Sequence, residues 1–188
     1  MRGERAIAWT VRETTLGTLL VAASERGVCR IAFGSSEEEL AALLARELPF
    51  ARLERDRGAV VAFADAIARA VEGDAAPVEL PLDVAGSRFQ ERVWTALRAI
   101  PRGEVRSYGE VAAAIGAPRA VRAVANACGA NPVAIAVPCH RVVARGGIGG
   151  YRYGPERKRA LLAREAARNA KGPAVPAGPR FDAFAVRL

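Results

Sequence analysis

Residues 107–129 of this 188-residue chain read SYGEVAAAIGAPRAVRAVANACG, and they decide the fold of its second half. Ser107 followed three residues later by Glu110 is a capping box, which predicts a short helix that ends at Gly116. Proline is favoured in the first turn of a helix, so a second helix is predicted from Pro118 to a C-terminal cap at the next glycine. Two short helices joined by a tight turn are typical of a helix-turn-helix.

The second helix of this motif is rich in alanine, so its exposed face can approach another surface closely. Arg119 and Arg122 are three residues apart and are predicted to be neighbours on that helix. The candidate contact residues for a partner surface are Arg119, Arg122, Ala123, Ala125 and Asn126.

The charge of the chain is unevenly distributed. Residues 1–85 hold 10 basic and 14 acidic side chains, a net charge of −4, whereas residues 86–188 hold 18 basic and 6 acidic side chains, a net charge of +12. A strongly basic half suits contact with a polyanion such as DNA. The alternative is a solvated basic surface in an arginine-rich chain.

The first half is predicted to be a small α/β unit. Residues 16–23 and 28–33 are apolar and partly β-branched with turn residues between them, which predicts a β-hairpin. Amphipathic helices are predicted over residues 36–48, opened by a capping box, and over residues 59–71. Residues 78–84 contain a proline and predict an edge strand or an extended linker.

Around the helix-turn-helix, the second half adds two helices and one buried run. Ser87 and Gln90 form a capping box that opens the helix FQERVWTALRAI. Residues 133–143, VAIAVPCHRVV, are an apolar run that we expect to be buried. A glycine-rich loop and a helix over residues 155–168 follow, and residues 170–188 are rich in Pro, Ala and Gly, which is typical of a flexible tail.

The composition excludes several classes of protein. No apolar run approaches the roughly 20 residues that a bilayer requires, and the first residues lack the pattern of a secretory signal, so we expect a cytoplasmic protein without membrane contact. The three cysteines are an odd number, and with a single histidine they lack the paired spacing of a zinc site. We expect free thiols and no metal, with Cys29 and Cys128 as buried structural residues.

Cys139 is followed directly by His140, the only histidine of the chain. The thiolate is the nucleophilic form of cysteine, and a nearby imidazole can take the thiol proton directly or through a water. Adjacent residues of an extended segment point to opposite faces, so we expect a bridging water. Glu165 is the favoured carboxylate to orient the imidazole, with Glu156 as its competitor. Taken alone, the dipeptide also fits a buried cysteine and a histidine with purely structural roles.

The stretch PCHRVV at residues 138–143, preceded by RAVRAVANACGAN and NPVAIAV and followed by GGYRYG and LLAREA, resembles the methylated-DNA-protein-cysteine methyltransferases, also called 6-O-alkylguanine-DNA alkyltransferases. The resemblance implies an α+β fold. A small amino-terminal α/β, ribonuclease H-like lobe would cover residues 1–80, and a mainly helical, winged-helix-like DNA-binding lobe would cover residues 81–169.

The resemblance also implies an activity. Such a protein repairs DNA by moving an alkyl group from 6-O-alkylguanine, and from 4-O-alkylthymine, onto its own cysteine once, without a cofactor. The implied partner is double-stranded DNA that contains alkylated guanine, bound through the minor groove by a monomer that needs no other protein.

Catalytic roles follow from the resemblance residue by residue. Cys139 would accept the alkyl group, and His140 would deprotonate it through a water. Glu165 would orient His140, and Asn131 would brace the turn ahead of the nucleophile. Tyr108 would donate a hydrogen bond to the leaving guanine.

Roles in DNA binding are implied in the same way. Arg122 would fill the gap that the flipped nucleotide leaves in the base stack, where a planar guanidinium suits better than an ammonium. Pro138, Val142 and Tyr151 would line the pocket for the flipped base.

Two other functions stay open at the level of sequence. One is a helix-turn-helix protein that senses alkyl damage without chemistry. The other is a cysteine hydrolase that uses Cys139, His140 and Glu165, although the chain lacks an oxyanion-hole signature.

Overall fold

The computed structural model describes residues 5–74 and 79–169, and the predicted tail over residues 170–188 lies outside them. The chain divides into two compact units, the first ending at Val84. The sequence-based boundary was four residues earlier, after residue 80. The difference arises because Val28 donates its N–H to Pro81 O at 2.8 Å and accepts the N–H of Asp83 at 2.9 Å, so this segment pairs with the first unit.

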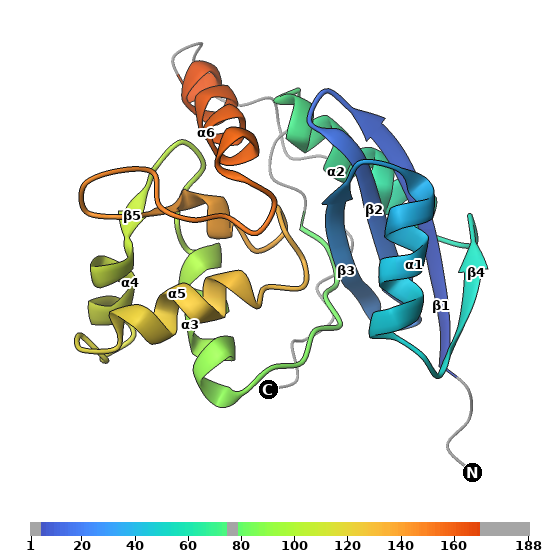
Figure 1. Cartoon of the computed structure of the whole chain (residues 1–188), viewed down its shortest axis with the longest axis horizontal. Helices are drawn as coiled ribbons and strands as arrows, with labels where there is room; N and C mark the ends of the chain where they lie inside the picture. The colour runs from blue at the N-terminus through green and yellow to red at the C-terminus, as the bar shows by residue number, and fades with distance from the viewer. Residues whose placement is uncertain (1–4, 75–78, 170–188) are drawn as a thin grey trace. The chain divides into compact units, whose positions relative to one another are not determined.

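The first unit is built on a four-stranded sheet (Figure 1). Strands β1 (Arg5–Thr14), β2 (Gly17–Ser24) and β3 (Gly27–Gly34) form an antiparallel meander. Strand β4 (Ala51–Arg55) pairs in parallel with β1, which gives the order β3-β2-β1-β4. The predicted hairpin is confirmed as β2 and β3.

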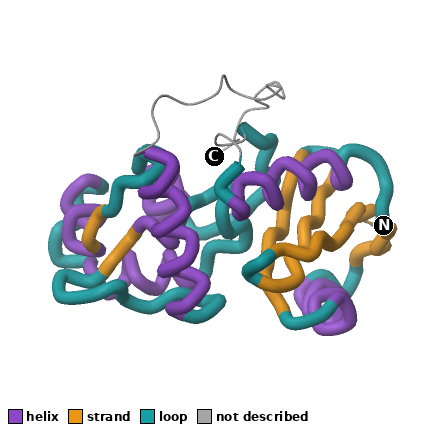
Figure 2. Tube along the Cα trace, turned by 90° about the horizontal axis from the view of Figure 1, so that it is seen from above, coloured by secondary structure: helices purple, strands orange, loops and turns teal. Residues whose placement is uncertain are grey.

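Two helices cover opposite faces of this sheet (Figures 1 and 2): α1 (Glu37–Glu47) and α2 (Val60–Glu72). Every residue of β2 between its two ends is buried, as expected for a strand covered on both faces. Helix α2 ends at Gly73, whose φ of +88° suits a residue without Cβ. Ser36 caps α1 as predicted, but the Glu39 carboxylate accepts from Ser35 N–H rather than closing a box on Ser36.

The second unit is mainly helical, and both of its predicted capping boxes are present. Helices α3 (Arg88–Arg98) and α4 (Tyr108–Ala114) start at Ser87 and Ser107, whose side chains accept the N–H groups of Gln90 and Glu110. Helices α5 (Val121–Gly129) and α6 (Pro155–Asn169) complete the unit. The buried Trp94 donates its indole N–H to Ala127 O at 2.9 Å and so joins α3 to α5.

The predicted start of the second motif helix at Pro118 is wrong. Ala120 donates its N–H to Ala117 O at 2.8 Å, which makes a turn with Pro118 at its second position, where proline is favoured. Helix α5 begins only at Val121, so Arg119 lies in the turn and is not a helical neighbour of Arg122.

A small parallel pairing sets the geometry around Cys139. Strand β5 (Arg106–Ser107) pairs with β6 (Val142–Val143), and this places the start of α4 beside the segment that follows the cysteine. Residues Cys139–Arg141 form one turn of 3₁₀ helix, η1, rather than the extended segment that we expected. None of the helices in the described part of the chain combines the length and apolar character that crossing a bilayer requires.

Candidate functional site

The candidate site is centred on Cys139, which is 6% exposed. Asn131 donates through Nδ2 to the Cys139 sulfur at 3.2 Å and to Val137 O at 2.8 Å. Its Oδ1 accepts the N–H of Val133 at 3.0 Å. A single buried amide therefore closes the turn over residues 131–137, ahead of the nucleophile, and also contacts the sulfur.

His140 lies against Glu165 and not against its competitor. Its Nε2 is 3.0 Å from Glu165 Oε1, and the two residues are 1% and 6% exposed. Glu156 is exposed on the first turn of α6, where it pairs with Arg159. The opposite nitrogen of the ring, His140 Nδ1, is buried and has no hydrogen-bond partner among the described residues.

Arg141 holds the glutamate in place, a role that the sequence did not reveal. Its Nε and one Nη donate to the two oxygens of Glu165 at 3.0 and 2.9 Å, and its other Nη donates to Ile100 O at 2.7 Å. The Gly103 N–H adds a fourth hydrogen bond to Glu165 at 3.2 Å. The only signal in the sequence was the position of Arg141 inside the PCHRVV stretch.

These contacts fix the protonation of the pair. Burial alone would raise the pKa of Glu165, but the hydrogen bonds and positive charges of His140 and Arg141 lower it to about 2. An ionised carboxylate only accepts hydrogen bonds, so Nε2 of His140 carries the proton. Burial lowers the pKa of His140 below 6.5 despite its carboxylate partner. The imidazole is therefore neutral near pH 7, with a free lone pair on Nδ1.

The thiol itself needs such a base. Burial raises the pKa of Cys139, while the hydrogen bond from Asn131 and the charge of Lys158 act in the opposite direction. The sulfur is consequently protonated in the free protein near pH 7, and the proton must leave before the thiolate can attack. A neutral imidazole one residue away is the group that can take it.

The other predicted site residues surround the same segment. Tyr108, the first residue of α4, is half-buried and donates to Gly150 O at 3.4 Å. Pro138 and Val142 are buried on either side of η1. Burial and the neighbouring Cys139 raise the pKa of Tyr151 well above 10, and its hydroxyl is buried without a partner among the described residues.

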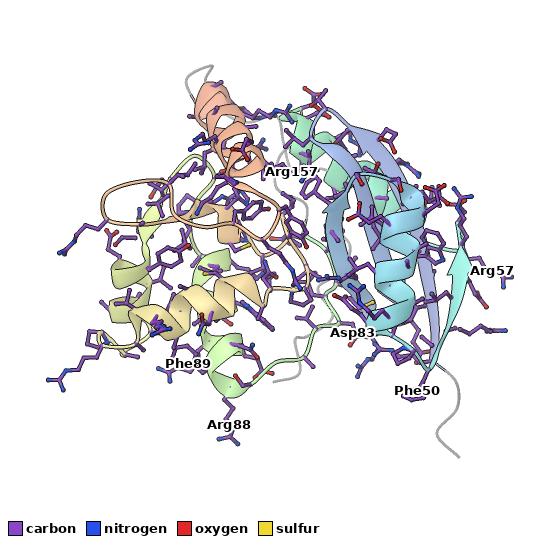
Figure 3. The ribbon with its side chains drawn as sticks, in the orientation of Figure 1. Phe50, Arg57, Asp83, Arg88, Phe89 and Arg157 are labelled. Carbon is purple, nitrogen blue, oxygen red and sulfur yellow. The ribbon has the colours of Figure 1, made fainter. Side chains whose placement is uncertain are left out.

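The candidate DNA-contact residues lie on the outside of α5 and in the turn before it. Arg122, Ala123 and Asn126 are exposed and Ala125 is half-buried, whereas Val124 and Ala127 face the core. The structure therefore separates these exposed residues from the cysteine cluster, which is formed by the buried residues Cys139, His140 and Glu165. Arg88, at the start of α3, is also exposed and projects away from the ribbon (Figure 3).

These features define a class: a helix-turn-helix protein of two units, with a buried cysteine beside a histidine-glutamate pair. Comparison with known proteins gives the same result. Residues 7–84 match the family model described as "6-O-methylguanine DNA methyltransferase, ribonuclease-like domain", and residues 88–167 match "6-O-methylguanine DNA methyltransferase, DNA binding domain". The chain belongs to the 6-O-methylguanine DNA methyltransferase family, and the predicted α+β class and family are confirmed.

Individual relatives agree with this assignment. The regulatory protein ada of Salmonella typhimurium is 46% identical over 86% of this chain, which spans only 46% of that relative. The methylated-DNA--protein-cysteine methyltransferase of Mycobacterium bovis is 51% identical over 60% of this chain and 69% of its own length. The crystal structure of the Mycobacterium tuberculosis O6-methylguanine methyltransferase has a TM-score of 0.73 and 37% identity, and covers 90% of this chain and 96% of that one.

Proposed function

We propose that this chain repairs DNA by transferring an alkyl group from the 6-oxygen of guanine to Cys139 in a single turnover. One observation carries the proposal: His140 directly follows the buried Cys139, its Nε2 lies 3.0 Å from Glu165 Oε1, and its Nδ1 is buried without a hydrogen-bond partner among the described residues. A family relationship to methylated-DNA--protein-cysteine methyltransferases supports the choice of substrate.

The chemistry follows from these protonation states. A water relays the thiol proton of Cys139 to His140 Nδ1, and the thiolate attacks the alkyl carbon. The carbon–oxygen bond breaks and its electron pair stays on the guanine, which Tyr108 stabilises with its hydroxyl hydrogen bond as the proton returns. The product on the protein is a thioether, which has no hydrolytic route back to the thiol. Each molecule therefore acts once.

The alkyl carbon is inaccessible inside a duplex, so the base must first rotate out of the stack. We propose that the exposed face of α5 and the turn before it lie along the minor groove, with Arg122 in the gap that the base leaves and Arg119 contacting from the turn. A crystal structure of the Mycobacterium tuberculosis OGT in complex with DNA, 37% identical with a TM-score of 0.73, supports a DNA partner for this fold. Pro138, Val142 and Tyr151 would enclose the flipped base.

The partner is double-stranded DNA with alkylated guanine, and 4-O-alkylthymine is a second substrate. The chain acts in the cytoplasm as a monomer, without a cofactor and without an obligatory protein partner.

The test is a repair assay with a molar excess of duplex that contains one 6-O-methylguanine. We expect product to stop at one equivalent of protein, and Cys139→Ala to form none while it still binds duplex in a salt-sensitive manner. Continued turnover would contradict the suicide mechanism, and turnover on an ester would indicate the cysteine hydrolase. Binding without any transfer by the wild type would favour the damage sensor.

A further inference from the structure

Lys158 is a buried lysine that the mechanism above does not use. It is one of two lysines among the 28 basic residues of the chain, and its side chain on α6 is 0% exposed. Its ammonium donates to Val142 O at 2.6 Å and to Gly150 O at 2.9 Å. A lysine that gives up all its hydration must be held by such bonds, because a buried ammonium is otherwise very costly.

The two carbonyls belong to different segments that follow the nucleophile in the chain. Val142 is three residues beyond Cys139 in β6, and Gly150 precedes Tyr151 in the loop that follows. Gly150 O also accepts the hydroxyl of Tyr108, whose ring centre lies 5.9 Å from the ammonium. One charged group therefore joins four elements: α6, the segment after the nucleophile, the loop and the start of α4.

In the described part of the chain, the charge of Lys158 is held by carbonyl groups and not by a carboxylate. Within residues 5–74 and 79–169 no aspartate or glutamate pairs with its ammonium, in contrast to Arg141 in the same unit. Burial lowers the pKa of Lys158, and the groups that act in the opposite direction are Cys139 and, from α5, Cys128, each in its thiolate form. The charge of Lys158 also acts on His140, and it lowers the pKa of both thiols against the effect of burial.

We propose that Lys158 is a positioning residue for alkyl transfer, whose ammonium fixes the segments of Val142 and Gly150 and supplies the buried positive charge that balances the thiolate of Cys139. This inference rests on the proposed function. The thiol proton goes to His140 by way of water and finally to the guanine, while Lys158 keeps its protons throughout. The ammonium balances the sulfur until the carbon–sulfur bond forms and the negative charge passes to the guanine.

The experiment measures how fast Cys139 reacts with iodoacetamide as a function of pH, because this small neutral electrophile needs neither DNA nor base flipping. Peptide mapping separates Cys139 from Cys29 and Cys128. In Lys158→Met, which removes the charge and keeps the length, we expect the midpoint of the pH profile to rise by about one unit or more. The rate at neutral pH should fall about tenfold, with a similar plateau at high pH.

Matched variants separate charge from anchoring. Lys158→Gln keeps a neutral donor and should shift the midpoint in the same direction, whereas Lys158→Arg keeps the charge and should stay near the wild type. Arg159→Met removes a charge from the same helix at a side chain that is 61% exposed, and solvent screening should leave its profile unchanged. Urea unfolding shows which variants are folded. If Lys158→Met does not fold, the pH profile of Lys158→Gln is used in its place.

An unchanged midpoint in the folded Lys158→Met or Lys158→Gln variant would overturn the proposal, because a purely structural anchor would lower only the plateau. The proposed function is tested separately, by measuring methyl transfer from DNA by the wild type. If the wild type transfers methyl from DNA and the midpoint does not move, only the role of Lys158 is lost. If the wild type transfers nothing, the proposed function fails whatever the midpoint does, and the role of Lys158 in alkyl transfer fails with it.

Discussion

At the scale of single residues, the hydrogen bond at Nε2 of His140 determines whether its other nitrogen, Nδ1, can accept a proton. Glu165 is ionised because Arg141, His140 and the Gly103 N–H all donate to it. Its charge in turn fixes the tautomer of His140 and leaves Nδ1 as an acceptor. Burial lowers the pKa of His140 more than Glu165 raises it, and the positive charge of Arg141 acts in the same direction as burial, so the imidazole stays neutral near pH 7.

This arrangement predicts a pH-dependent stability for Glu165. Its pKa in the folded protein is about 2, below the ordinary value of 4.5, so its contribution is present above the ordinary value and is lost as the pH falls through about 2. The shift corresponds to about 3 kcal/mol. In urea unfolding, Glu165→Gln should therefore be less stable than the wild type by about 3 kcal/mol near pH 7, and the difference should shrink by more than half near pH 3. An equal difference at both pH values would mean that Glu165 is not ionised in this way.

At the scale of the elements, α5 is asymmetric: its inner residues pack on α3 and α4, and its outer residues carry the candidate contacts. Arg122 is on the outer side and makes no contribution to the core. If its role is to stabilise an extrahelical base, it matters for duplex but not for a base that is already free.

We therefore predict that Arg122→Ala slows repair of duplex that contains 6-O-methylguanine by at least about tenfold and slows the reaction with the free 6-O-methylguanine base by less than about twofold. Arg57→Ala is the control, since Arg57 is an exposed arginine of the first unit (Figure 3) that pairs with Glu54. Single-turnover rates on the two substrates give the comparison. Equal loss on duplex and free base would remove the base-flipping role of Arg122.

The turn between α4 and α5 depends on the backbone of one glycine. Gly116 has φ +68°, whereas Gly129, at the end of α5, has ordinary helical geometry, and an added Cβ would meet nothing within 4 Å at either position. Gly116→Ala should therefore cost about 1–2 kcal/mol of unfolding free energy through strain alone. Gly129→Ala should add up to about 1 kcal/mol through helix propensity. Urea unfolding of both variants checks the prediction, which fails if their effects have the same sign.

What the sequence could predict at this scale depended on how local each signal was. The helices that begin after Ser87 and Ser107 were predicted correctly, because the whole signal of a capping box lies within four consecutive residues. Strand β1 was missed although Ile7, Trp9 and Val11 alternate, and β4 was missed because its five residues hold a single large apolar side chain. The start of α5 was misplaced because proline suits both the first turn of a helix and the second position of a β-turn.

At the site, the sequence placed the residues along the chain but could not give the contacts between them. The resemblance implied the pairing of Glu165 with His140, but the contact joins residues 25 positions apart and is made by the packing of α6 against η1, which leaves Glu156 exposed. Lys158 gave a weak signal, a rare lysine in an arginine-rich chain. Its bonds to Val142 and Gly150 depend on the course of a glycine-rich loop that no local pattern predicts.

At the scale of the whole molecule, charge and chemistry belong to the same half of the chain. Residues 86–188 carry the net charge of +12, and the second unit holds the cysteine cluster and the helix-turn-helix. A basic surface raises the local concentration of protein on DNA but does not choose a base. In this account, the choice is made by the enclosed cysteine, which reacts only with a base that can leave the stack.

The most direct test of this account is the mass of the intact chain after it is mixed with duplex DNA that contains one 6-O-methylguanine, followed by peptide mapping. We predict a single gain of about one methylene that maps to Cys139 and saturates at one equivalent, since a thioether is not released. Undamaged duplex and Cys139→Ala should give no gain. DNA binding without any change in mass, or a methyl group on another residue, would contradict the account.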